Sequence, residues 1–218
     1  MGDHKKKLIH KVKQGDYLAS IASDYGFGSW EEIWNHDENE GLRTLRENPQ
    51  VLYPGDQVSI PEKTQQSEPA ATEVRHRFIR KFPKILIRID IRDRRKNDTD
   101  REDPECCLKM RHEDALLSPE EDILEHEILV TEKNPTLLVD GRTYPIHIGH
   151  LDPVDKESGQ WKRLHNLGYL PRPFDSKSKH EKHELEGATA DFQADQDLQI
   201  DGVCGPKTQS QLIDVHGS

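Results

Sequence analysis

The chain has 218 residues, of which 32% are apolar and 33% are charged, and its formal net charge at pH 7 is -10. No run of about 18 uncharged apolar residues occurs and residues 1–13 lack the apolar core of a secretion signal, so we expect a cytoplasmic protein without a signal peptide. So acidic a chain lacks the basic surface that nucleic acids require, which leaves neither nucleic acid nor membrane as an expected partner. The low apolar content favours several small modules over one large core.

The first predicted elements are two strands that enclose two helices. Residues 8–12 alternate in polarity, as a strand does, and an apolar stripe then predicts a helix that ends at Gly26. The stripe comprises Leu18, Ile21, Ala22 and Tyr25. A second helix is expected from Ser29, with Ser29 and Glu32 as its capping box, and residues 57–60 form a closing strand.

Residues 8–62 resemble a LysM module. The matching positions are residues 10–18, 21–22, 30–35 and 48–61. Modules of this family have a βααβ fold and usually bind glycans that contain N-acetylglucosamine, such as peptidoglycan or chitin. The resemblance implies a glycan-binding groove between two loops, formed by Gly15, Asp16, Tyr17, Leu18, Asn48, Pro49, Val51, Leu52 and Tyr53.

Apolar side chains in such a groove would pack on the sugar, so we expect Tyr17 and Leu52 to be exposed in their loops. Residues 36–47 form a longer and more charged stretch than the family has at this place, and we expect it to cover part of the groove. The alternative, that these loop residues only close a small fold, remains open.

The middle of the chain changes from helical to strand periodicity. Residues 63–76 are polar without periodicity and are predicted to be a linker. The predicted strands cover residues 85–92, 107–112 and 127–131, followed by a hairpin whose turn is Asp140-Gly141. An acid-rich loop is expected at residues 93–105. We therefore expect a small β-sandwich or barrel over residues 77–150.

Helical signals return in residues 151–218. Trp161, Leu164 and Leu167 share one face of a helix that Gly168 ends, a second helix carries Leu185, Ala188 and Phe192, and a third begins at Pro206. Two tight turns, at Asp201-Gly202 and at Gly205, precede the third helix. Three short helices predict a compact bundle, and the whole chain is expected to be an α+β multidomain protein.

This C-terminal region resembles the peptidoglycan-binding-domain-1 family, a three-helix module. The resemblance rests on residues 163–169, Phe192-Gln193, Leu198, residues 201–208 and Leu212. The sequence departs from the family at residues 171–182, where a first copy of the Asp-Gly turn should stand. If that first turn helps to bind the wall, its replacement affects binding by this region.

We expect neither a catalytic site, nor a cofactor, nor a metal site. The pairs His180 with His183 and His147 with His150 have metal-like spacing. However, the first pair is expected in a charged, exposed helix start, and the second at the end of a strand with no acid at a recognised spacing. Cys204 lies in a turn where a small buried residue is the simpler interpretation, and the acidic loop before Cys106-Cys107 disfavours a thiolate. A wall hydrolase with two catalytic carboxylates is the least favoured hypothesis, because only about seventy residues remain outside the two recognised modules.

Two non-catalytic functions remain. The chain as a whole resembles, more loosely, accessory proteins of contractile injection machines such as type VI secretion systems and phage-tail-like particles. That resemblance implies an adaptor that docks on a spike, tail or effector protein, and is exported with it. The alternative is a bivalent protein that binds peptidoglycan through both end modules.

Overall fold

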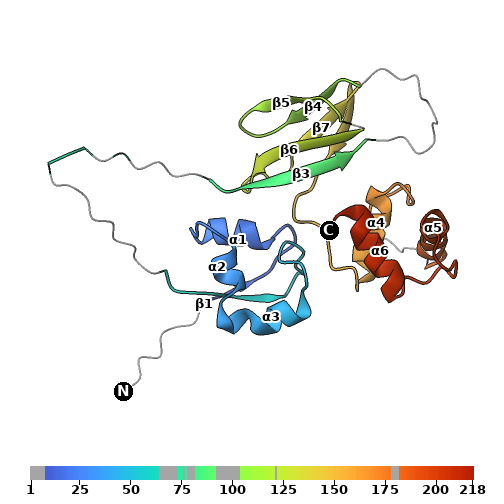
Figure 1. The fold of residues 1–218 in the computed structure, drawn as a ribbon, viewed down its shortest axis with the longest axis horizontal. Helices are drawn as coiled ribbons and strands as arrows, with labels where there is room; N and C mark the ends of the chain where they lie inside the picture. Colours follow the sequence, from blue (N-terminus) through green and yellow to red (C-terminus); the bar gives the residue numbers. More distant parts are fainter. Residues whose placement is uncertain are drawn as a thin grey trace.

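The computed structural model describes residues 8–63, 73–75, 77, 82–91, 104–120, 122–177 and 182–218. Helices and small antiparallel sheets follow one another along the chain, so the fold is α+β (Figure 1). The elements are β1 (Leu8–Lys11), α1 (Leu18–Asp24), α2 (Glu31–Trp34), η1 (Asp37–Asn39), α3 (Glu40–Leu45), β2 (Gln57–Ile60), β3 (Lys84–Asp90), β4 (Cys106–Lys109), β5 (Asp114–Leu117), β6 (Ile123–Leu129), β7 (Thr136–Val139), β8 (Arg142–Pro145), α4 (Glu157–Asn166), α5 (Lys182–Asp195) and α6 (Pro206–His216). Most of the predicted linker and residues 93–103 of the acidic loop lie outside the described residues.

The N-terminal module comprises β1 to β2 and has its own core. β1 and β2 pair antiparallel, with Leu8 opposite Ile60. Apolar side chains of β2 and of the three helices, with Val12 after β1, form one cluster, which includes Leu18, Ile21 and Ile33. The predicted capping box is wrong: α2 begins at Glu31, and Ser29 Oγ accepts a hydrogen bond from the backbone N–H of that residue at 3.2 Å.

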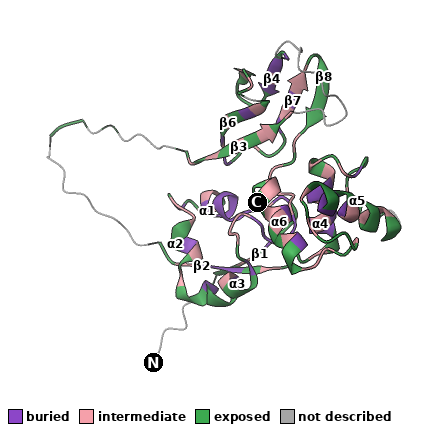
Figure 2. Ribbon diagram, turned by 45° about the vertical axis from the view of Figure 1, so that its right-hand side comes forward, coloured by how far each residue is buried: buried purple, intermediate pink, exposed green. Residues whose placement is uncertain are grey.

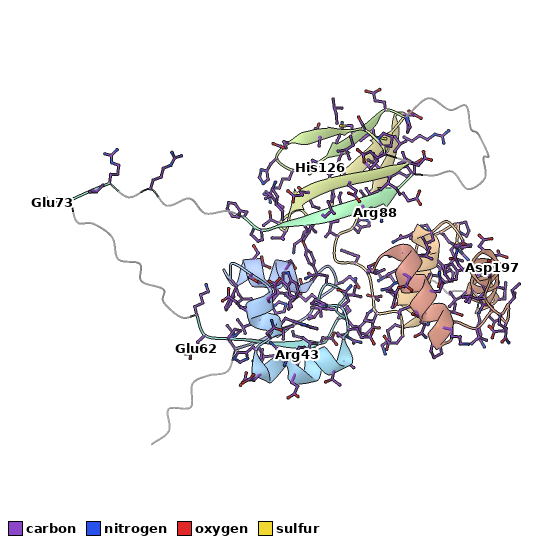
Figure 3. The ribbon with its side chains drawn as sticks, viewed as in Figure 1. Arg43, Glu62, Glu73, Arg88, His126 and Asp197 are labelled. Atoms are coloured by element: carbon purple, nitrogen blue, oxygen red, sulfur yellow. The ribbon has the colours of Figure 1, made fainter. Side chains whose placement is uncertain are left out.

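Residues 37–45, which the sequence assigned to a charged stretch over the groove, form η1 and α3. Asn39 anchors them, because its buried side-chain amide donates to Ile33 O and Ser59 O and accepts from Ser59 N. Arg43 on α3 lies on the side of the module that faces away from the β3–β6 sheet (Figure 3). The helical stretch therefore packs under β2.

The elements β3 to β8 form a sandwich of two sheets. One sheet pairs β3 with β6, and the other has the order β5-β4-β7-β8. Buried side chains from both sheets share one cluster, which contains Leu124, Ile128, Cys106, Leu108 and Leu137. The predicted hairpin is confirmed: Asp140 and Gly141 have φ values of 48° and 76°, and they connect the antiparallel strands β7 and β8. Strand β5 was not predicted.

The C-terminal helices α4, α5 and α6 share a core of Trp161, Leu164, Leu170, Ala188, Phe192 and Leu212. α4 ends with Leu167 as its C-cap, followed by Gly168 at φ 84°, as the sequence predicted. Pro206 occupies the first turn of α6, where its missing N–H costs no hydrogen bond.

A smaller apolar cluster joins the N-terminal module to the sandwich. It consists of the buried residues Tyr17, Ala19 and Val130, with Trp30, Ile85 and Ile148 packed against them. Helix α1 is mostly buried and lies beside the β3–β6 sheet (Figure 2). The N-terminal module therefore contacts the sandwich through the very loop that the LysM resemblance assigned to glycan binding.

Candidate functional sites

The structure brings together the two loops of the predicted glycan groove. We call residues 15–18 and 48–53 the loop pair. The N–H of Leu18 donates to Pro49 O at 3.3 Å, and the N–H of Ala19 donates to Gln50 Oε1 at 3.1 Å. Asn48 Oδ1 in turn accepts from the N–H of Gln50. These bonds fix one loop against the other, so the residues predicted together do lie together.

The expected exposure of the loop side chains is wrong. Tyr17 and Leu52 are 2% and 3% exposed, and Leu18 and Val51 are also buried. The Tyr17 side chain points into the sandwich, where its hydroxyl donates to Val130 O at 2.8 Å. Burial first, and then the charge of Asp24, raise the pKa of Tyr17 to about 12. Tyr17 is thus an interface residue between two parts of the fold.

The other polar groups of the loop pair also have partners within the chain. Asp16 Oδ2 accepts from the N–H of Lys13 at 2.8 Å and lies 3.0 Å from His10 Nε2. The N–H of Tyr53 donates to Asp56 Oδ2, the carboxylate that also binds the buried Arg46 side chain. These contacts stabilise the loop conformation.

A segment that is distant from the loop pair in sequence packs against it. We call residues 147–156, which connect the sandwich to α4, the cover segment. A Cβ atom placed on Gly149 would lie 2.6 Å from Gly15 O and 2.7 Å from Tyr17 Cδ1, so the two backbones are in direct contact. His150 packs on Gly15, and its carbonyl oxygen accepts from Gln14 Nε2 at 3.3 Å. Burial first, then His147 and Lys162, lower the pKa of His150.

The far end of the cover segment reaches the second loop. Asp155 Oδ1 lies 3.9 Å from the Arg46 guanidinium, and Lys156 Nζ lies 6.0 Å from the centre of the Tyr53 ring. Helix α4 holds the middle of the segment at Asp152. The Arg163 side chain donates to Asp152 O at 2.7 Å, and Lys162 Nζ pairs with the Asp152 carboxylate at 2.5 Å. No sequence pattern predicts this contact, because the residue types in 147–156 carry no information about a partner more than one hundred positions away.

The second candidate site is a turn of the C-terminal helices at residues 200–203. The buried Gln193 side chain holds it: its oxygen accepts from the N–H groups of Asp201 and Gly202, and its nitrogen donates to Asp201 Oδ1, Val203 O and Thr208 Oγ1. The hydrogen bonds that the Asp201 carboxylate accepts, from Val203 N–H first and Gln193 next, lower its pKa. We call this stretch the Gln193 turn.

Two large apolar side chains project from the Gln193 turn. Ile200 and Val203 are 63% and 62% exposed, although the turn beneath them is fixed by four hydrogen bonds to one buried side chain. A rigid turn that presents apolar side chains on both sides of a carboxylate can contact a sugar face or a peptide methyl group while the carboxylate accepts hydrogen bonds.

The region that departs from the family, residues 171–182, uses other contacts. Arg172 O accepts from Trp161 Nε1 at 3.0 Å, and the Arg172 side chain binds both oxygens of Glu184. Phe174 lies edge-on to the Trp161 ring at 6.4 Å. Residues 178–181, including His180 of one predicted histidine pair, lie outside the described residues.

A buried polar group lies under α4 and α6. Arg163 is 2% exposed and donates to Gly159 O and Ser218 O as well as to the cover segment, and burial lowers its pKa to about 10. Burial first, and then Arg163, lower the pKa of His216 to about 4. Burial raises the pKa of Cys204 to about 11, so its thiol is protonated at neutral pH and is a poor nucleophile.

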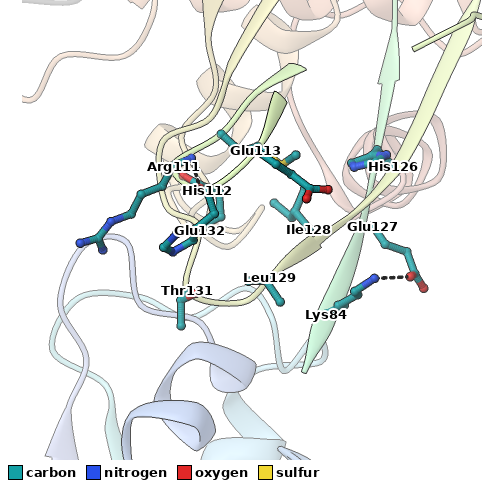
Figure 4. Close-up of a pocket in the computed structure, with 11 residues that line it drawn as sticks. Lys84, Arg111, His112, Glu113, His126, Glu127, Ile128, Leu129, Thr131 and Glu132 are labelled. Carbon is teal, nitrogen blue, oxygen red and sulfur yellow. Dashed lines mark hydrogen bonds and ion pairs between the residues drawn. The ribbon is translucent and has the colours of Figure 1, made fainter. Parts of the chain in front are cut away.

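A pocket of about 310 Å³ opens at one end of the sandwich (Figure 4). It carries both signs of charge, yet several of its groups are already paired: Lys84 contacts Glu127 at 3.3 Å, and Glu132 accepts from the N–H of Arg111. The Arg111 guanidinium points away from the other lining residues (Figure 4). This arrangement selects neither an anion nor a cation.

His147 and His150 lie side by side, with ring centres 5.3 Å apart. Within the described part of the chain, no three histidine, cysteine or acidic side chains are grouped so that they could hold a metal ion. In the same residues, no helix combines the length and apolarity needed to cross a membrane.

The comparison with known families bears on the C-terminal helices. A family model described as "Putative peptidoglycan binding domain" matches residues 161–212, which extend from α4 into α6 and include the Gln193 turn. The match covers less than half of the chain and confirms the resemblance predicted for this region. It supports a wall-binding role with peptidoglycan as a partner. No curated protein and no solved structure gives a significant match. The LysM and injection-machine resemblances stay predictions.

Proposed function

We propose that the protein is a non-catalytic peptidoglycan-binding protein that contacts the wall through its C-terminal helices. The observation that carries the proposal is the family match over residues 161–212, because this stretch contains the Gln193 turn and its two exposed apolar side chains. Ile200 and Val203 pack on the apolar face of a sugar or on a methyl group of the stem peptide. Asp201 accepts hydrogen bonds from hydroxyl or amide groups of the same ligand.

The non-catalytic part of the proposal rests on the side chains that a hydrolase would need. The Cys204 thiol has a pKa of about 11, far from the activated thiolate of a cysteine enzyme. The described histidines and acids do not converge in threes. We expect no soluble muropeptides to appear when the purified protein is incubated with sacculi, and their release, abolished by a point mutation, would contradict this.

Sedimentation with purified sacculi tests the binding site. The double substitution Ile200→Ser and Val203→Ser removes apolar surface that is already exposed, so the fold should be retained while at least about tenfold of wall affinity is lost, since each contact contributes roughly 1 kcal/mol. The control is Leu116→Ser. The Leu116 side chain is 81% exposed and belongs to β5 of the sandwich, not to the C-terminal helices that carry the Gln193 turn. Equal sedimentation of all three proteins would exclude this turn as the wall contact.

A second candidate function is an adaptor in a contractile injection machine, as the looser resemblance implies. The observation that favours it is the cover segment: the N-terminal module already uses its loop pair to contact protein, at Gly149 and His150. In that function the N-terminal module docks on a spike, tail or effector protein, and the C-terminal helices contact wall or cargo. We expect cross-linking in the producing cell, followed by purification of the tagged chain, to recover components of such a machine; recovery of wall fragments alone would favour the first function.

A further inference from the structure

The contact between Gly149 and the loop pair leaves no room for a side chain. Gly149 has a φ of 74°, and a Cβ atom there would lie within 2.7 Å of both Gly15 O and the Tyr17 ring. Real Cβ atoms do not approach other atoms so closely, so only glycine fits at this place. The loop pair thus accepts a polypeptide backbone at van der Waals distance, with the shape of a turn that a glycine permits.

Neighbouring contacts extend the recognition in both directions along the cover segment. Towards the N-terminal side, Ile148 packs in the apolar cluster of Tyr17 and Val130. Towards the C-terminal side, the His150 ring lies on Gly15 and its carbonyl oxygen accepts from Gln14. The loop pair and the residues around it therefore contact an apolar residue, a glycine and a histidine in succession along the segment.

Charged groups add recognition at the second loop. The Arg46 guanidinium, which Asp56 fixes at 2.8 Å, lies 3.9 Å from Asp155, and the Tyr53 ring lies under Lys156. An acidic residue followed by a basic one matches this part of the surface. A sugar could not occupy the Gly15 and Tyr17 contacts at the same time, because Gly149 fills that space.

We propose that the loop pair is a polypeptide-binding site, and that its resident occupant is the chain's own cover segment. The ligand class is a peptide turn with glycine at its centre, an apolar residue before it and histidine after it. This site is separate from the Gln193 turn, so it does not depend on the proposed wall contact. While the occupant is attached to the same chain, its effective concentration, on the order of millimolar, keeps free peptides out.

The test uses the full chain and a synthetic peptide of residues 147–156. The substitution Gly149→Ala displaces the tethered segment from the loop pair, because the new methyl group collides with Gly15 O. We expect the labelled peptide to bind this variant saturably, at least about tenfold more tightly than the wild type. A peptide with alanine at the glycine position should not bind, and neither should chitotetraose.

The matched control is Gly141→Ala. Gly141 has nearly the same backbone conformation, with a φ of 76°, but no atom lies within 4 Å of a Cβ placed there. This variant carries the same backbone strain and should behave as the wild type towards the peptide. Amide resonances of residues 15–18 locate the binding.

Three outcomes overturn the proposal. If chitotetraose binds Gly149→Ala at residues 15–18, the loop pair is a glycan site. If the wild type and the variant bind the peptide equally, the peptide binds elsewhere on the protein. If a folded Gly149→Ala variant binds no peptide, the loop pair is not a peptide-binding site. If Gly149→Ala does not fold, the double variant Asp155→Ala and Lys156→Ala replaces it, since both side chains are more than two-fifths exposed. It frees only one end, so saturable but weaker peptide binding is then expected, and its absence counts against the proposal. Sacculus sedimentation should not change in any of these variants.

Discussion

His216 illustrates how a single half-buried residue makes the stability of the C-terminal helices depend on pH. Its ring Nδ1 lies 2.6 Å from Ser218 Oγ and its Nε2 lies 3.0 Å from Asn166 Nδ2, and the buried Arg163 cation is near. Both the loss of water and the positive neighbour disfavour the imidazolium. The folded protein therefore binds a proton at His216 less readily than the unfolded chain does.

We predict that acid destabilises these helices through His216. Its pKa falls from 6.5 to about 4 on folding, so the unfolded state binds more protons in that interval and stability declines as the pH falls through it. The shift corresponds to a loss of about 2–3 kcal/mol between pH 7 and pH 4. Chemical denaturation at several pH values measures it. His216→Asn should flatten the dependence, whereas substitution of the exposed His183 should leave it; equal slopes in all three proteins would contradict the assignment.

At the residue scale, the sequence predicted which positions matter better than what they do. Tyr17 was expected to be exposed in a glycan site, but its side chain is buried and joins two parts of the fold, because its hydroxyl donates to Val130 O, 113 positions along the chain. Gln193 was recognised within a family pattern, but only the structure explains the pattern: one amide satisfies the polar groups of a whole turn. Residue type and spacing indicate neither the Val130 partner of Tyr17 nor the turn that Gln193 holds.

At the scale of elements, local signals predicted the structure where they are strong. The apolar stripe of α1 and the Asp140-Gly141 turn depend only on nearby residues, and both are confirmed. α3 was missed because its single buried apolar residue, Leu42, gives no periodic stripe, and its anchor Asn39 acts through the distant Ser59. β5 was missed for a similar reason, since its four residues are stabilised by pairing with β4.

We predict that Gln193→Ala destabilises the C-terminal helices by about 2–4 kcal/mol, because the buried polar atoms of the turn lose their partners. It should also weaken sacculus binding, since Ile200 and Val203 then lose their fixed positions. Chemical denaturation followed by tryptophan fluorescence, with Trp161 in the core, measures the first effect. Gln199→Ala, in the same turn region but exposed, should change the stability by less than about 0.5 kcal/mol. Similar losses in the two variants would show that the amide network does not support the turn.

At the scale of the whole molecule, the N-terminal module, the sandwich and the C-terminal helices are connected by the cover segment. It contacts the loop pair through Gly149 and His150, and α4 through Asp152. This arrangement could not be predicted from the sequence. Each module has a local sequence pattern, but the contacts between modules join residues far apart in the chain and leave no such pattern. The resemblance to LysM modules located the loop pair, while its occupant became visible only in three dimensions.

We predict that Tyr17→Phe loosens the N-terminal module from the sandwich. The change removes one buried hydrogen bond and leaves Val130 O without it, which corresponds to about 1–2 kcal/mol. In the wild type the pKa of about 12 means that the Tyr17 contribution persists below pH 10 and disappears as the pH rises from 10 to 12. Hydrogen exchange at residues 147–151 should accelerate in the variant, and Tyr144→Phe, on the exposed face of β8, should not change it. Unaltered exchange in Tyr17→Phe would mean that the hydroxyl does not couple the two parts.

The position of the cover segment in the chain also has a consequence during synthesis. The loop pair and strand β2, which closes its module, are complete once residue 60 has left the ribosome, but the occupant is not made until residue 156 follows. At about 5–20 residues per second, the roughly one hundred intervening residues take on the order of 5–20 seconds. During this interval the nascent chain presents a finished binding surface to every polypeptide around it, so a partner that associates co-translationally meets no competitor.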